Sequence, residues 1–231
     1  MKTIGIIGGM SWHSTELYYR LLNEGVQQKL GGLHSAKILM ASVEFAEIAE
    51  LQKQGDWDKA GDILADCAQK LEQSGADFIV IATNTMHISV PIIEQRISIP
   101  ILHIADATAD AILQQGFSKV GLLGTRFTMQ MDYFKSRLVQ KGLEVVIPTE
   151  QDMSMVDKVI FDELCYGDIR DDSREGYLST INDLKSKGAE CIIEGCTEIA
   201  LLVKPEHTDV PLFDTTAIHA QAIVEYALLE G

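Results

Sequence analysis

Residues Ile192–Ala200 read IIEGCTEIA, and this stretch decides which fold the chain adopts. An apolar run from Cys191 stops at Gly195, and apolar residues with helical spacing resume directly after the turn. That pattern predicts a buried strand that leads into a helix. Cys196 then lies at the carboxyl end of the strand, which is where open α/β sheets bind their ligands.

Cys196 has two interpretations on this stretch alone. Backbone N–H groups and the dipole at the start of a helix favour a thiolate over a thiol, which predicts a reactive cysteine. A cysteine is also commonly a buried, inert and small apolar side chain. The stretch by itself leaves both interpretations open.

The composition limits the classes of function. The chain has 231 residues, of which 46% are hydrophobic, enough for one large domain or two small domains with their own cores. The net charge of −15, with no block of basic residues, argues against nucleic acid and anionic membranes as partners. No apolar run approaches the length of a membrane span, and apolar strand residues begin near Ile4 without a leader, so we expect a soluble, cytoplasmic protein. The four cysteines lack C-x-x-C spacing and the histidines lack metal-ligand spacing, so we expect no metal.

Strands and helices alternate along the whole chain. The expected strands lie near residues 3–8, 37–42, 78–82, 101–104, 119–124, 143–147, 191–195 and 210–213. The expected helices lie near residues 12–22, 45–54, 57–73, 106–116, 129–141, 155–164, 174–187 and 217–229, and a further one begins within residues 83–87. Ser11 or Ser14 is expected to cap the first helix, and Asp56 the third. This alternation predicts an α/β protein with parallel sheets covered by helices.

The chain also contains an internal repeat. GIIGGMS near residue 5 resembles GLLGTRFT near residue 121, and IVIATNTMH near residue 79 resembles CIIEGCTEIA near residue 191. A duplicated α/β unit explains both pairs and puts Thr83 and Cys196 at equivalent positions. If the halves are related by a pseudo-twofold axis, these two side chains flank one cleft from opposite sides.

Opposed groups across a cleft suit a reaction that removes a proton from one face of a carbon and returns one to the other. Such a reaction needs a base held close to the carbon, a site without water and stabilisation of the developing charge. The two turns supply backbone N–H groups. Four side chains in them can add hydrogen bonds to a carboxylate: Asn84, Thr85, Thr125 and Thr197.

The TNTMH and GCTEI motifs, together with the GGM opening, resemble the aspartate/glutamate racemase family over the whole chain. The resemblance implies a cofactor-independent racemase in which two cysteines act as acid and base on opposite faces of an amino acid. It also implies two similar parallel-sheet α/β domains, residues 1–100 plus 212–231 and residues 101–211, with the active site between them. A homodimer is implied as well, with the final helix packed on the first domain and a small amino acid as the substrate.

The resemblance also assigns the site. It implies Cys196 and Thr83 as the catalytic pair. The substrate-binding residues that it implies are Met10, Gln52, Asn84, Thr85, Thr125, Thr197 and Glu198. Thr83 stands where the family usually has cysteine, and an alcohol is a far weaker acid than a thiol with its reference pKa near 8.5. The Thr/Cys pair resembles members described as specific for L-aspartate and L-glutamate. In related racemases the cysteine of the second half acts on the L isomer, so the resemblance implies Cys196 as the base for the L isomer.

Three local questions stay open in the sequence. The aspartate-specific member of the family binds the distal carboxylate, that of the substrate side chain, with a basic residue. The resemblance places Cys165 at that position in this chain, and Arg126 and Lys158 are candidates for the role. Glu198 either binds the substrate ammonium or opposes a thiolate at Cys196. His87 either assists protonation or packs at the start of a helix.

Two other functions compete with racemisation. A single cysteine that protonates an enediolate also suits a decarboxylase or a cis–trans isomerase of the same superfamily. A non-catalytic receptor for acidic amino acids is the alternative from a different class, with Thr83 marking lost chemistry. Proton exchange at the substrate carbon separates the racemase from both.

Overall fold

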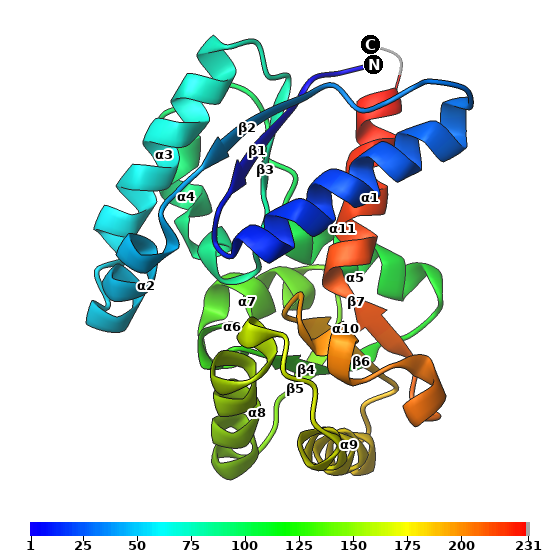
Figure 1. Ribbon diagram of the computed structural model, residues 1–231. Coiled ribbons are helices and arrows are strands. Elements are labelled where there is room, and N and C mark those ends of the chain that lie inside the picture. The colour runs from blue at the N-terminus through cyan, green and yellow to red at the C-terminus, as the bar shows by residue number, and fades with distance from the viewer. Residues whose placement is uncertain (230–231) are drawn as a thin grey trace. The chain divides into compact units, whose positions relative to one another are not determined.

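Strand β1 (Ile4–Gly8) begins the first of two parallel sheets in the computed structural model, which describes residues 1–229 (Figure 1). The chain divides into two units, Met1–His103 with the chain from His219 onward, and Ile104–Ile218. The expected boundaries lay after residues 100 and 211, and the observed divisions follow His103 and Ile218. β7 (Leu212–Asp214) pairs with β6 (Cys191–Gly195), so this short strand belongs to the second sheet and not to the first domain as we had expected.

The first unit is built on a parallel sheet in the order β2-β1-β3. Its elements are β1, α1 (Trp12–Leu30), β2 (Ile38–Ser42), α2 (Phe45–Gln54), α3 (Trp57–Gln73), β3 (Phe78–Ile81), the 3-10 helix η1 (Thr85–Ser89), α4 (Val90–Glu94) and the larger part of α11 (Thr215–Leu228). One core packs α2, α3 and α4 against the sheet. A second core packs α1 and α11 against it, and Figure 1 shows these two helices side by side. Because both faces are covered, β1 and β3 are continuous in buried residues.

Local sequence signals set the ends of several of these elements. The Ser14 N–H donates to Ser11 Oγ at 3.4 Å, so Ser11 caps α1, and Asp56 caps α3 by accepting from the Lys59 N–H at 3.2 Å. Gly9 follows β1 with φ +93, and a Cβ there would collide with the Val43 carbonyl oxygen. Only glycine therefore fits the turn that opens the GGM motif.

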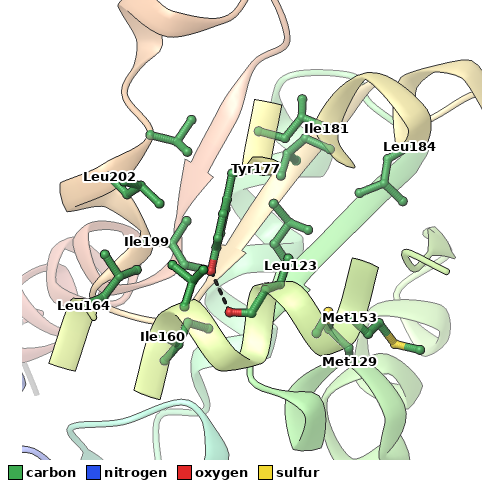
Figure 2. Close-up of a cluster of buried hydrophobic side chains, with 14 of the residues drawn as sticks. Leu123, Met129, Met153, Ile160, Leu164, Tyr177, Ile181, Leu184, Ile199 and Leu202 are labelled. Atoms are coloured by element: carbon green, nitrogen blue, oxygen red, sulfur yellow. Dashed lines mark hydrogen bonds between the residues drawn. The ribbon is translucent and has the colours of Figure 1, made fainter. Parts of the chain in front are cut away.

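The second unit carries a parallel sheet in the order β5-β4-β6-β7. Its elements are α5 (Ile104–Gln114), β4 (Lys119–Gly124), α6 (Arg126–Gln130), α7 (Asp132–Gln140), β5 (Glu144–Val146), α8 (Glu150–Asp162), the 3-10 helix η2 (Leu164–Tyr166), α9 (Asp171–Ser186), β6, α10 (Ile199–Leu202), the 3-10 helix η3 (Pro205–His207) and β7. One core joins the sheet to α5 and α7. The other joins it to α8, α9 and α10, with the Tyr177 ring among the aliphatic side chains of that core (Figure 2). The predicted α/β class with two parallel sheets is confirmed.

Three expected elements differ in the structure. The strand expected at residues 101–104 is a single bridge between Ile101 and Ile79, because α5 already begins at Ile104. The helix expected at residues 129–141 is two helices, α6 and α7, separated at Met131, whose ψ of 154 is extended. The helix expected after Cys196 shrinks to the four residues of α10.

The two sheets repeat one topology. β1, β2 and β3 correspond to β4, β5 and β6, and the Ile79–Ile101 bridge takes the place of the β6–β7 pairing. Gly5 pairs with Ile79 in the first sheet, and Gly121 pairs with Ile192 in the second. Thr83 and Cys196 each come four residues after the paired isoleucine, so they occupy equivalent positions in their own units.

Candidate active site

Thr83 lies just beyond the carboxyl end of β3, in what we call the Thr83 turn, residues 82–87. The Ala82 N–H donates to the Ile7 carbonyl at 2.9 Å, which extends the pairing with β1 to the base of the turn. The Thr83 side chain is partly exposed, whereas Asn84 and Thr85 are buried. In the described part of the chain the Thr83 hydroxyl makes no hydrogen bond, so its one polar atom is available to a ligand.

Met10 and Gln52 lie in the core beneath this turn. Met10 is buried in the cluster that packs α2 and α3, and Met86 of η1 belongs to the same cluster. The buried Gln52 side chain donates through Nε2 to Met86 Sδ at 3.0 Å. A thioether is a weak acceptor, so the amide gives up little when it turns to a stronger one such as a carboxylate.

Cys196 lies directly after β6 in what we call the Cys196 turn, residues 195–198. Its Sγ–H donates to Glu198 Oε2 at 3.0 Å, and the Thr197 hydroxyl donates to the same oxygen at 2.5 Å. Cys196 is a partly buried residue that packs against the core that holds α8 and α9. Three predicted site residues, Cys196, Thr197 and Glu198, are therefore joined through one carboxylate oxygen.

The protonation state of Cys196 differs from the stabilised thiolate that one of the two interpretations of this stretch expects. Burial raises the pKa of the Cys196 thiol well above its usual range, and the Glu198 carboxylate raises the pKa further. The expected dipole is missing because α10 has only four residues and begins at Ile199, three residues beyond the sulfur. Without a substrate, Cys196 is a thiol that donates to a carboxylate.

Thr125 follows β4 as Cys196 follows β6. Gly124 and Gly195 pair across these strands, so the next residue of each strand leaves the sheet at the same edge. Thr125 caps α6, and its Oγ1 accepts from the Thr128 N–H at 3.4 Å. The second unit thus brings two predicted substrate-binding positions, Thr125 and Thr197, to one edge of its sheet.

Cys165 is a neighbour of the Cys196 turn, although it is not among the site residues predicted from the sequence. Burial, and then the charge of Glu198, raises the pKa of Cys165 to about 12, so a neutral thiol stands beside that carboxylate. Cys165 lies in η2 and packs against the same core as Cys196. The two cysteines are 31 residues apart in sequence, so only the packing of η2 brings them together.

Arg126 is already occupied by partners of its own. Its guanidinium pairs with Glu150 and donates to Ser154 Oγ at 2.6 Å, while its backbone N–H donates to Asp157 at 2.6 Å. These contacts hold α6 against α8. The structure therefore gives Arg126 a structural role and does not support it as the partner of a distal carboxylate.

Two features are absent from residues 1–229. No group of histidine, cysteine, aspartate and glutamate side chains there has the arrangement of a metal site. No helix in that range combines the length and apolar character needed to cross a bilayer.

The chain resembles known proteins in family, in sequence and in structure. Residues 7–223 match the model of a family described as Asp/Glu/Hydantoin racemase. The chain is 26% identical over 228 residues to the broad specificity amino-acid racemase RacX of Bacillus subtilis, and the match covers 96% of each protein.

Solved structures resemble the whole chain. A protein from Yersinia pestis, provisionally assigned as an Asp/Glu racemase, is 51% identical with a TM-score of 0.94, and the match covers 99% of this chain and 100% of that one. An aspartate racemase homologue from Pyrococcus horikoshii is 35% identical with a TM-score of 0.86, covering 98% and 99%. The aspartate racemase of Picrophilus torridus, 22% identical with a TM-score of 0.75 over 98% and 94% of the chains, shares the fold.

Proposed function

Because this chain belongs to the Asp/Glu/hydantoin racemase family, we propose that it acts on the acidic amino acids L-aspartate and L-glutamate through Cys196 and Thr83. The family and its named relatives identify the chain as a racemase, an isomerase, as the sequence motifs predicted. The observation that carries the proposal is the equivalence of Thr83 and Cys196 at the ends of β3 and β6. In the proposed reaction they act on opposite faces of one substrate carbon, without a cofactor.

Cys196 is the proposed base for the L isomer. Its proton has an acceptor already in place, because Sγ donates to Glu198 Oε2 at 3.0 Å. The substrate brings a positively charged α-ammonium group, and a positive charge near a thiol lowers its pKa. Substrate binding therefore supplies the stabilisation of the thiolate that the turn alone lacks, as the thiol proton passes to Glu198.

The thiolate then takes the α-proton, and the electron pair of the C–H bond moves into the substrate carboxylate to form an enediolate. Hydrogen bonds to that carboxylate stabilise the developing charge. The proposed donors are backbone N–H groups of the two turns with the side chains of Asn84, Thr85, Thr125 and Thr197. Met10 and Gln52 complete the substrate pocket in the proposal.

Thr83 is the proposed group at the face from which the D isomer forms. A hydroxyl is a poor proton donor and a poorer base, so proton transfer at this face is slow, whether direct or through a water that Thr83 orients. The enantiomers have equal free energy in water, so a strictly one-way racemase is impossible. Preference for L substrates therefore means fast exchange at Cys196 and slow formation of the D isomer.

The side-chain carboxylate distinguishes aspartate and glutamate from neutral amino acids. Cys165, where the resemblance implies a lysine in aspartate-specific relatives, is a neutral thiol beside Glu198. That substitution removes a charge that would favour an acidic side chain. The Bacillus relative carries the name broad specificity racemase, so neutral amino acids belong in the test beside aspartate and glutamate.

The test is proton exchange in heavy water. We expect the α-proton signal of L-aspartate or L-glutamate to disappear at least about tenfold faster than D product accumulates, a barrier difference of roughly 1.4 kcal/mol. NMR follows the α-proton and chiral chromatography follows the D isomer. We expect Cys196→Ser to abolish both α-proton exchange and D-isomer formation, whereas Cys67→Ser, which alters a half-buried cysteine of α3, retains both reactions.

Each alternative leaves its own signature in this experiment. Exchange that survives Cys196→Ser contradicts the assignment of the base. Binding of aspartate without exchange indicates a receptor, and loss of carbon dioxide from a malonate substrate indicates a decarboxylase. Exchange confined to neutral amino acids contradicts the proposed acidic substrates but remains consistent with proton abstraction by Cys196.

A further inference from the structure

Four buried rings, one of which belongs to the last residue of the Thr83 turn, lie together within the first unit. His87 is 1% exposed, His103 is 5% exposed, and Tyr18 and His219 are fully buried. The ring centroids of His87 and His103 are 4.5 Å apart, and those of His87 and His219 are 5.8 Å apart. The mechanism above uses none of these residues.

His219 fixes one side of this set. Its Nε2 lies 3.0 Å from the Leu102 carbonyl oxygen, which can only accept, so Nε2 carries the proton. Its Nδ1 then accepts from the Tyr18 hydroxyl at 2.9 Å. Burial lowers the pKa of His219 to about 4, so the ring is neutral at neutral pH and both nitrogens are satisfied.

His87 connects the set to the Thr83 turn. Its Nδ1 lies 2.8 Å from the Thr83 carbonyl oxygen, so Nδ1 carries a proton and donates it to the backbone at the end of β3. The backbone N–H of His87 donates instead to the Asn84 carbonyl at 3.2 Å. The imidazole, rather than the following helical turn, thus supplies the donor for this carbonyl.

We propose that His87 is a positioning residue that anchors the Thr83 carbonyl and so directs the Thr83 hydroxyl toward the substrate. This proposal rests on the proposed function, in which that hydroxyl acts at the face where the D isomer forms. The carbonyl anchor limits the backbone of Thr83, and the packed rings of His103 and His219 limit rotation of His87 itself. The Cys196 carbonyl has a different partner, because it accepts from the Ile199 backbone N–H at 3.2 Å, while the Cys196 sulfur donates to Glu198.

The proposal predicts an effect on one face of the substrate only. Loss of the His87 anchor should slow D-isomer formation while α-proton exchange of the L isomer continues. A general loss of structure would lower both rates together. The ratio of D-isomer formation to L-isomer exchange therefore separates positioning from folding.

Two substitutions of His87 make a matched pair. Asparagine places its amide N–H near the position of Nδ1, whereas glutamine places its amide near Nε2, one bond farther from the backbone. We expect His87→Asn to keep the ratio within about twofold of the native value, and His87→Gln to lower it at least about fivefold with L-isomer exchange retained. His34→Gln, at an exposed histidine, is the control that leaves both rates unchanged.

The outcomes separate the two proposals. If the native protein shows no L-isomer exchange, the proposed function fails before any variant is made. If the native protein exchanges but His87→Gln leaves the ratio unchanged, or lowers both rates equally, the positioning role is overturned. A measurement on the native protein does not depend on the folding of a variant: ¹⁵N NMR of the histidine rings should show His87 in the Nδ1–H tautomer, and the Nε2–H tautomer would overturn the proposal as well.

Discussion

Cys196 meets its proton acceptor two residues away, in Glu198. The thiol donates to a carboxylate that also accepts from the Thr197 hydroxyl, and these contacts stabilise the thiol form. In the proposed mechanism, the ammonium group of the amino-acid substrate is the cation that shifts the sulfur to the thiolate. Under that proposal the sulfur is reactive only when substrate is bound, which limits its reaction with other electrophiles.

Replacement of Glu198 tests this control at the residue scale. Burial raises the pKa of Cys196 first and the Glu198 carboxylate raises it further, so Glu198→Gln should lower that pKa by removing the second cause. The pH midpoint for alkylation of Cys196 by iodoacetamide, followed by mass spectrometry of its peptide, should move to lower pH. Proton exchange of L substrate should slow at the same time, because the acceptor of the thiol proton is lost.

The control for this prediction is Glu190→Gln, which removes an exposed carboxylate at the start of the same strand. It should leave the alkylation midpoint of Cys196 in place. A midpoint that stays unchanged or rises in Glu198→Gln would show that the carboxylate does not hold the proton on sulfur.

At the scale of elements, β6 and β7 bring two carboxyl groups together. Glu194 and Asp214 are direct partners in the sheet register, and Glu194 is only 3% exposed. Burial, and then the charge of Asp214, raises the pKa of Glu194 to about 8. The Oδ1 atom of Asp214 accepts hydrogen bonds from the backbone N–H groups of Thr216 and Ala217 at the start of α11.

This strand pair predicts a pH-dependent stability. Between the ordinary carboxyl pKa of 4.5 and about 8, the native protein holds a proton on Glu194 that the unfolded chain releases. The free energy of unfolding therefore falls as pH rises through that window. Glu194→Gln removes this loss, so it should raise the free energy of unfolding at pH 7 by about 1–3 kcal/mol and have little effect near pH 4.5, as measured by urea unfolding.

Glu190 provides a comparison, because its pKa is shifted in the direction opposite to that of Glu194. Backbone N–H groups of Ser118 and Lys119 donate to its carboxylate and lower its pKa. Its stabilising contribution is present above the ordinary carboxyl pKa and is lost as pH falls, so Glu190→Gln should lower stability at neutral pH. A loss of stability in Glu194→Gln at pH 7 would contradict the account of the β6–β7 pair.

At the scale of the whole molecule, the two units share one sheet topology but carry different side chains, Thr83 and Cys196, at the equivalent position. The sheets share strand order and register, and Thr83 and Cys196 follow paired isoleucines by the same four residues. The surroundings have diverged as well. Thr83 has an imidazole on its carbonyl, whereas Cys196 has a carboxylate on its sulfur.

Restoring a thiol at the first position tests the consequence of this divergence. We expect Thr83→Cys to speed turnover of D-aspartate or D-glutamate at least about tenfold, because a thiol is a much stronger acid than an alcohol. D-isomer formation from L substrate should then approach the rate of α-proton exchange, as measured by NMR with chiral chromatography. Thr83→Ser keeps a hydroxyl and should leave the ratio of D-isomer formation to L-isomer exchange near the native value. If Thr83→Cys also left that ratio unchanged, the slow step would not be proton transfer at residue 83.

Much of the fold was predictable because its signals are local. The apolar run at Phe78–Ile81 and the predicted helix Phe45–Gln54 appear in the structure, with Asp56 as the predicted cap of the next helix. Each depends on the periodicity or capping of neighbouring residues, which the sequence displays directly. The errors at residues 101–104 and 129–141 arose where the chain changes direction, which periodicity does not encode.

The sequence by itself determined the class of the fold, its internal repeat and the family, because apolar runs and the TNTMH and GCTEI motifs are properties of consecutive residues. Only the tertiary structure decided the protonation of Cys196, the neutral Cys165 beside Glu198 and the rings around His87. His103 and His219 are 116 residues apart, and both lie near His87 only after the sheet and α11 have packed. Burial and the nearest charge set a pKa or a tautomer, and both are products of the folded chain rather than of any stretch of it.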